Sequence, residues 1–158
     1  MAACVPDLTN VSMLSPLGFK LGINAQEFKY LEYFCTSVTF PAIALPAAET
    51  KYTNMYAPLA GDSLRYDPLS VSFILDEDMK NYLEIYNWLY KNSKESIVYR
   101  DLTLSILTNQ SNPNIIVQYM GAAPTGLSSF EFNTQNTDIQ YLTCTVDFAY
   151  TSFKFVVT

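Results

Sequence analysis

The segment YDPLSVSFILDEDMKNYLEIYNWLYKN (residues 66–92) decides the fold, because one period of apolar residues replaces another within it. Up to Leu75, apolar residues alternate with serines, which is the two-residue period of a half-buried strand. After the acidic residues 76–78, apolar residues recur every three or four positions, which is the period of an amphipathic helix. We therefore predict a strand that ends near Asp76 and a helix whose N-cap is Asp76.

The predicted helix is apolar on more than one side. One stripe begins at Met79 and ends at Tyr90, and we assign it to the core with the preceding strand and the last strand of the chain. Ile85 and Trp88 lie off this stripe, so we expect them to contact a neighbouring molecule. The predicted core positions are Leu69, Val71, Phe73, Met79, Tyr82, Leu83, Tyr86, Val146 and Phe148.

The rest of the chain is predicted to consist mostly of strands. The sequence indicates a mainly β (α+β) fold: an antiparallel β-sandwich or half-barrel of about seven strands with one flanking α-helix. Residues 1–15 show no periodicity and are expected to form a flexible arm before a single domain of residues 16–158. The other predicted strands lie at residues 17–23, 31–40, 102–106, 115–119, 127–133 and 139–157, with turns at 24–29 and 121–126.

The connection from Ala47 to Ser63 is long for a domain of this size. Loops of more than about 12–15 residues without regular structure are usually functional or disordered. This connection contains four large apolar or aromatic side chains, so we expect it to dock on another molecule. The predicted interface residues are Tyr52, Met55, Tyr56 and Leu59, together with Ile85 and Trp88.

Composition limits the chemistry. The 158 residues carry a net charge of −6, the wrong sign for binding nucleic acid through phosphates. The chain has no histidine, which removes Ser-His-Asp and Cys-His catalysis, and it has no glycine-rich phosphate loop. The three cysteines Cys4, Cys35 and Cys144 are far apart, so we expect free thiols, and we expect no cofactor, metal or membrane span.

Two alternatives to a structural protein remain open. Asp76 and Asp78 follow an apolar strand, as the Asp-x-Asp pair of a metal-dependent transferase does, although acids before a helix have a simpler explanation in the helix dipole. The aromatic content also suits a monomeric carbohydrate-binding β-domain. On composition alone we favour a non-enzymatic, β-rich module that associates with others.

Three segments resemble the tail-tube fold family of contractile-tailed bacteriophages. The first is YDPL with VSFILDEDMKNYLEIYNWL, which is most similar to the members that terminate the tube and stabilise the sheath. The second is SSFEF followed by TCTVDFAYTSFKF, similar to the final hairpin of the family. The third, FCTSVTFPAIALP, looks like an early strand and proline turn of the family, so the resemblance extends over residues 17–155.

The resemblance implies a structural virion protein without catalytic residues. Such a protein would form a hexameric ring at the end of a contractile tail tube, terminate tube growth and stabilise the last sheath ring and neck junction around the DNA channel. Its expected partners are copies of itself, the tube, sheath and neck or connector proteins, with DNA passing unbound, after assembly in the bacterial cytoplasm. The major tube protein and a baseplate tube initiator are the alternative roles within the family.

Overall fold

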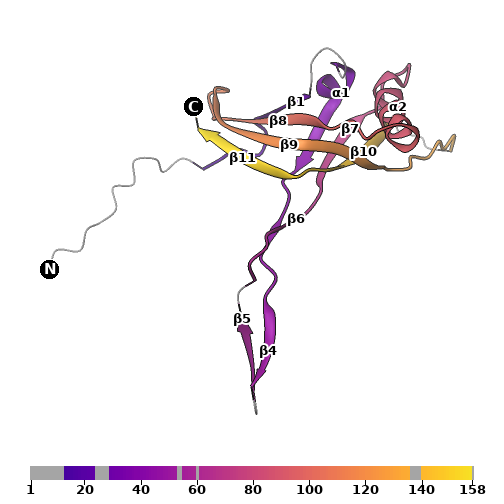
Figure 1. The fold of residues 1–158 in the computed structure, drawn as a ribbon. Helices are drawn as coiled ribbons and strands as arrows, with labels where there is room; N and C mark the ends of the chain where they lie inside the picture. The colour runs from indigo at the N-terminus through magenta and orange to yellow at the C-terminus, as the bar shows by residue number, and fades with distance from the viewer. Residues whose placement is uncertain (1–12, 24–28, 53–54, 60, 136–139, 158) are drawn as a thin grey trace.

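The computed structural model is a bent antiparallel sheet with two helices on one side and a hairpin that projects from the opposite side (Figure 1). It describes residues 13–23, 29–52, 55–59, 61–135 and 140–157. Seven strands form the main sheet, in the order β1-β8-β9-β10-β7-β2 with β11 also paired to β9. Their bounds are β1 Phe19–Ile23, β2 Cys35–Thr39, β7 Leu69–Ile74, β8 Arg100–Leu107, β9 Pro113–Leu127, β10 Thr143–Ala149 and β11 Ser152–Val157.

The long strand β9 joins the two halves of the sheet. Its first half pairs with β8 and β11, and its second half pairs with β10. Between the halves lies Gly121, whose φ of 62° is in the left-handed region that glycine adopts without strain. The side chains buried by both halves belong to one core cluster, so the sheet closes over a single core as a half-barrel. The predicted mainly antiparallel β fold is confirmed.

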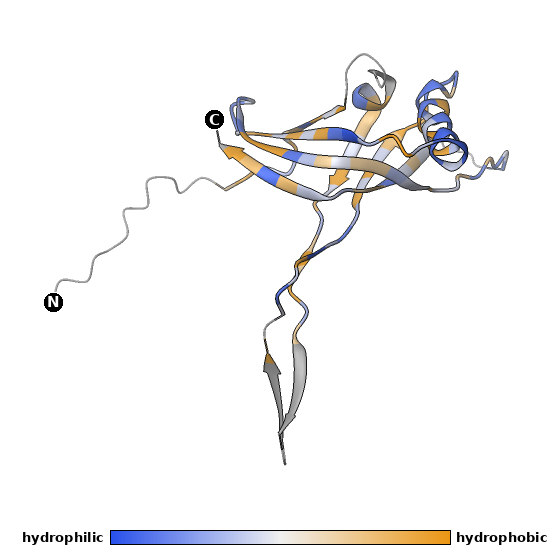
Figure 2. Ribbon diagram, viewed as in Figure 1, coloured by the Kyte–Doolittle hydropathy of each residue, from blue (hydrophilic) through white to orange (hydrophobic). Residues whose placement is uncertain are grey.

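The core follows the alternation seen in the sequence. Leu69, Val71 and Phe73 on β7 are fully buried, and Val146 and Phe148 lie beside them on β10 and are also fully buried. Full burial of such a side chain contributes about 1.5–3 kcal/mol each. In Figure 2 the hydrophobic colour is concentrated on the strands of the sheet, whereas α2 (Lys80–Lys94) is mostly hydrophilic in colour.

A short helix, α1 (Lys29–Phe34), replaces part of a predicted strand. The strand predicted over 31–40 begins only at Cys35, and the prediction of one helix is wrong because the described residues form two. Leu31 of α1 is fully buried in the core, and the Glu32 Oε1 atom accepts a 2.5 Å hydrogen bond from the Ile23 amide. These tertiary contacts with β1 and the core override the strand-like local pattern.

The helix α2 starts later than predicted, and its N-cap is not Asp76. Met79 occupies the N-cap with a φ of 53° and no side-chain cap hydrogen bond. Asn81 instead makes the side-chain hydrogen bonds at this end of the helix. Its Nδ2 donates to the Ile74 carbonyl at 2.7 Å, and its Oδ1 accepts from the Tyr82 amide at 2.9 Å. The acids 76–78 form a turn, closed by a 2.9 Å hydrogen bond from the Met79 amide to the Asp76 carbonyl.

The other boundary predictions also need correction. The connection from Ala47 to Ser63 is not irregular: β4 (Ala48–Tyr52) and β5 (Met55–Leu59) form a hairpin, and β3 (Ile43–Ala44) pairs with β6 (Arg65–Tyr66) at its base. The predicted break at 121–126 lies inside β9, because the bulge at Gly121 bends the strand without ending it. The predicted strand at 127–133 is absent beyond Leu127, and the last predicted run is divided into β10 and β11.

Two further predictions concern the N-terminal arm and membrane spans. Most of the proposed arm, residues 1–15, lies outside the described residues, and its described residues Met13 and Leu14 are exposed. Within the described part of the chain, no helix has the length and apolar character needed to cross a bilayer.

Candidate functional site

The inward face of α2 holds the helix on the sheet. Asn81, Ile85 and Trp88 are its buried residues, spaced at i, i+4 and i+7. The Trp88 ring lies 5.9 Å from the Phe148 ring, and its Nε1 donates to the Val98 carbonyl at 3.0 Å. Ile85 and Trp88 therefore belong to the core of the subunit, and their assignment to an interface is wrong.

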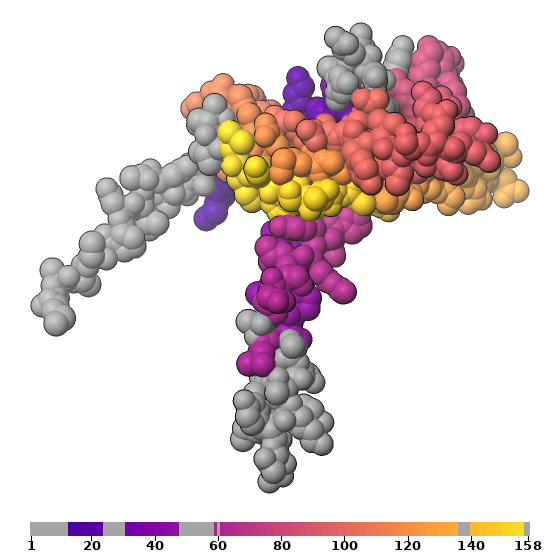
Figure 3. All heavy atoms as spheres, in the orientation of Figure 1, coloured from indigo at the N-terminus to yellow at the C-terminus, as the bar shows by residue number. Residues whose placement is uncertain are grey.

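The outward face of α2 carries residues that were assigned to the core. Leu83, Tyr86 and Tyr90 are 48%, 49% and 54% exposed, and the last two rings stack at 6.2 Å (Figure 3 shows α2 at the surface, in pink to salmon). The core assignment of Leu83 and Tyr86 is therefore wrong. Met79 and Tyr82 are only half-buried, with the Tyr82 ring packed at 5.4 Å against Phe130.

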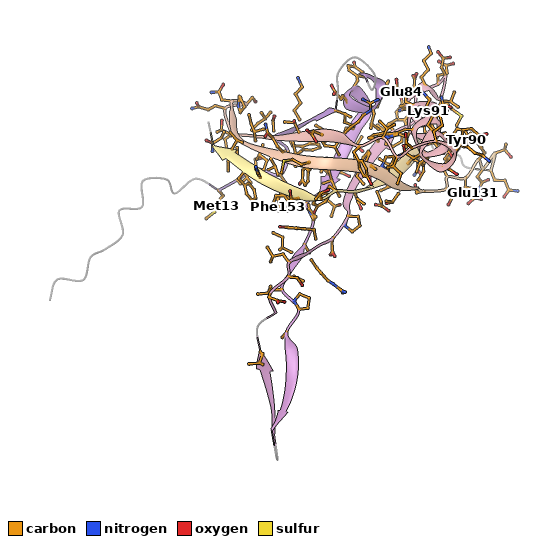
Figure 4. All side chains as sticks on the ribbon, in the orientation of Figure 1. Met13, Glu84, Tyr90, Lys91, Glu131 and Phe153 are labelled. Atoms are coloured by element: carbon orange, nitrogen blue, oxygen red, sulfur yellow. The ribbon has the colours of Figure 1, made fainter. Side chains whose placement is uncertain are left out.

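Glu84 lies on the side of α2 that faces α1, and Tyr90 lies on another side of the helix (Figure 4). One carboxylate oxygen of Glu84, Oε2, is buried without a hydrogen-bond partner among the described residues. Burial raises the pKa of this carboxyl above its usual value, and a hydrogen bond from the Leu31 amide offsets part of that rise. The helix pair thus carries a small electrostatic cost at neutral pH.

One face of the sheet is lined by hydroxyl groups. It is the uncovered side of β2, β7 and β10, opposite the core. Ser70 Oγ donates to Asp147 Oδ1 at 2.5 Å, and the hydroxyls of Ser72 and Thr145 lie 2.9 Å apart. These three strands contain no lysine or arginine, and Asp147 is their one formal charge. The alternating serines were visible in the sequence, but their common face was not.

The hairpin and its base form a further surface. The backbone of Tyr52, Met55 and Tyr56 lies in β4 and β5, but their side chains are outside the described part of the structure, so their interface role stays a prediction. Leu59 is 53% exposed. Near the base, the exposed side chain of Phe40 packs at 5.7 Å against Phe153 of β11.

The acidic residues before α2 are engaged with the helix start. Asp78 accepts a 2.5 Å hydrogen bond from Lys80 Nζ, and Asp76 Oδ1 accepts a 3.0 Å bond from the Glu77 amide. No group of three or more potential metal ligands is found among the described residues. Cys35 and Cys144 are free thiols, and burial raises the pKa of Cys35 to about 11.

The comparisons with known proteins agree on one family. The sequence profile described as "Phage tail tube protein" matches residues 5–156. The tail tube terminator protein of Enterobacteria phage T4 is 28% identical over 131 residues, covering 75% of this chain and 74% of that protein.

Two solved structures of terminators have the same fold. The anti-feeding prophage tube-terminating cap superposes with a TM-score of 0.75 at 14% identity, covering 100% of both chains. The sheath/tube terminator of the extracellular contractile injection system PVC superposes with a TM-score of 0.64 at 15% identity, covering 94% of this chain and 100% of that one. With a family profile that covers almost the whole chain, the resemblance is confirmed: this protein belongs to the phage tail tube protein family.

Proposed function

We propose that this protein is a tail tube terminator: a virion component that forms a hexameric ring on the end of a contractile tail tube and stops tube growth. The observation that carries the proposal is the 28% identity to the T4 tail tube terminator over three-quarters of both chains. The full-length likeness to the tube-terminating cap supports a fold suited to that position.

Open sheet edges support assembly into a ring. Within the described residues, β1 pairs only with β8 and β2 pairs only with β7, so each leaves one edge without a partner strand. Exposed edges invite uncontrolled pairing unless another chain covers them. In a closed ring each subunit offers one surface to the next, which satisfies both sides of the contact and limits growth around the ring.

The projecting hairpin supports the same conclusion. A two-stranded hairpin is marginally stable by itself in water, and β4–β5 pairs with no third strand among the described residues. Contact with a neighbouring subunit or tube ring would stabilise it. Tyr52, Met55, Tyr56 and Leu59 are the proposed contact residues on this hairpin.

The hydroxyl-lined face is suited to the wall of a DNA channel. Lysine and arginine on such a wall would bind phosphates and release counterions, which would hold the DNA. The strands β2, β7 and β10 present serine and threonine hydroxyls with Asp147 and no cation. DNA would therefore pass this face without being bound. The opposite, helix-bearing side would then be available to sheath and neck components.

The experiment that tests the function is the assembly state of the purified chain, measured by light scattering and negative-stain microscopy. A terminator gives single six-membered rings, either in solution or on tube ends. Long hollow filaments would instead identify the chain as the tube protein itself. A chain that remains monomeric even with tube ends present would contradict the whole proposal.

The channel assignment has its own test in assembled rings. Replacing Thr145 by Lys places a cation on the hydroxyl-lined face, and such rings should retain DNA at low salt and release it as salt rises. The matched control places the cation elsewhere, with Thr151→Lys at an exposed position outside β10. Equal DNA retention by both variants would contradict the assignment of this face to the channel.

A further inference from the structure

The outward face of α2 carries a stripe of three exposed apolar side chains. Leu83, Tyr86 and Tyr90 are separated by three and four residues, and each is about half-exposed. This is the spacing of the a and d positions of a heptad, which places all three on one seam. At 1.5 Å per residue the stripe is about 10 Å long, which is two turns of helix.

Nothing within the described part of the subunit covers this stripe. The buried face, made by Asn81, Ile85 and Trp88, points to the sheet on the other side of the same helix. Solitary exposed apolar residues are normal on a protein surface, but three side chains about half-exposed along a heptad seam match the surface that an amphipathic helix buries.

Charges at the two ends of the stripe give the partner a direction. Before the helix lie the three acids Asp76, Glu77 and Asp78, and with Lys80, the first residue of α2, this end has a net charge of −2. At the other end lie Lys91 and Lys94, which with Glu95 give a net charge of +1. A helix packed antiparallel to α2 would bring its own C-terminal end to the acids and its N-terminal end to the lysines.

We propose that the stripe Leu83–Tyr86–Tyr90 is the docking site for an amphipathic helix of a partner protein. That helix packs antiparallel to α2, carries basic residues toward its C-terminal end and acidic residues toward its N-terminal end. Antiparallel packing also sets the two helix dipoles in the favourable arrangement. This inference rests on the proposed function, because a tube terminator needs partners on its outer surface. It adds the kind of partner, an amphipathic helix.

The test uses two synthetic helical peptides of about 17 residues, long enough to form helix on a surface. Both have leucine at the a and d positions. The matched peptide has glutamate in its first turns and lysine in its last turns, and the reversed peptide has the same composition in the opposite order. Binding to the full chain is measured by fluorescence anisotropy. We expect the matched peptide to bind at least tenfold more tightly than the reversed peptide.

Variants of the chain separate the apolar from the electrostatic contribution to peptide binding. Leu83→Ser with Tyr90→Ser should weaken binding of the matched peptide at least tenfold. Tyr99→Ser removes a 60% exposed tyrosine outside the stripe and should leave binding unchanged. Glu77→Lys combined with Lys91→Glu and Lys94→Glu should reverse the preference between the two peptides. These three positions are exposed, so the charge variant remains informative even if the serine variant unfolds.

Three outcomes would overturn the inference. One is the absence of saturable binding by either peptide, and another is equal binding by the wild type and a folded serine variant. The third is a change in ring size or self-association of the serine variant in light scattering, which would make the stripe a contact between copies. Matched-peptide binding by a chain that never forms rings would instead contradict the proposed ring and leave the docking site standing.

Discussion

The two faces of α2 have exchanged the roles that their sequence pattern suggests. The inward face contains one polar and two apolar residues, Asn81, Ile85 and Trp88, and all three are buried. The outward face has the longer apolar stripe, yet Leu83, Tyr86 and Tyr90 remain about half-exposed. The most regular apolar stripe of a helix therefore need not be the one that stabilises the subunit. Burial follows the fit to the sheet, and the other stripe remains exposed.

Trp88→Ala should produce the largest effect on the inward face. Removing this ring deletes the contact with Phe148 and the hydrogen bond to the Val98 carbonyl, at a cost of about 3–5 kcal/mol of unfolding free energy. Chemical denaturation measures the change, with Tyr86→Ala as the aromatic control two residues away. An unchanged melting temperature with loss of assembly would return Trp88 to the interface.

Asn81→Ala should have the second largest effect. The substitution leaves the part-buried Ile74 carbonyl and Tyr82 amide without the side chain that now satisfies them. A buried group left without its partner costs about 1–3 kcal/mol. Asn81→Asp is the matched variant, because it keeps an acceptor for Tyr82 but loses the donor to Ile74. Wild-type stability in the alanine variant would show that α2 does not depend on this anchor.

Glu84→Gln tests the side of α2 between its two faces. Folding raises the pKa of this acid, so the folded state favours the protonated form, and the stabilisation present at low pH is lost as pH rises through the folded pKa. Glutamine remains neutral and still accepts a hydrogen bond from the Leu31 amide. We expect equal stability of the two proteins near pH 4, and a gain of about 0.5 kcal/mol or less for the variant at pH 7, because solvent screens a partly exposed group. Thermal unfolding at both pH values measures this, and a less stable variant at pH 7 would contradict it.

Leu83→Ser and Tyr86→Ser on the outward face should have the smallest effect. Substitutions at exposed positions usually change stability by no more than about 0.5 kcal/mol. The loss should appear only in partner binding, which separates this face from the inward one. A melting temperature that falls as far as in Trp88→Ala would mean that the stripe stabilises the subunit, and the distinction between the faces would be wrong.

Much of the subunit is predictable from the chain. The alternation in Leu69–Ile74 gives both the strand and its buried face, because a strand has only two sides. A helix can pack any of its sides on a sheet, and the apolar residues of α2 allowed either of two faces to be the buried one. The position of Asn81 decided between them, since its amide bridges β7 and the helix start, and no local pattern marks a polar residue as buried.

Other elements depend on contacts distant in sequence. The six residues of α1 are too few to show a helical period, and the helix is fixed by Leu31 in the core and Glu32 against β1. The two sequence positions between β4 and β5 are Thr and Asn, which is not one of the glycine-containing pairs that indicate a hairpin. The hydroxyl-lined face needed the register of β7 and β10, which the serines and threonines do not encode by themselves.

The proposed role in ending tube growth can be tested by measuring tube length. Tail tube protein of the same phage is allowed to elongate, and the purified chain is added at increasing ratios before negative-stain microscopy. We expect tube lengths to stop increasing at a ratio of about one ring per tube end, with added density only at the ends. Continued elongation, or incorporation of the chain along the tube wall, would contradict it.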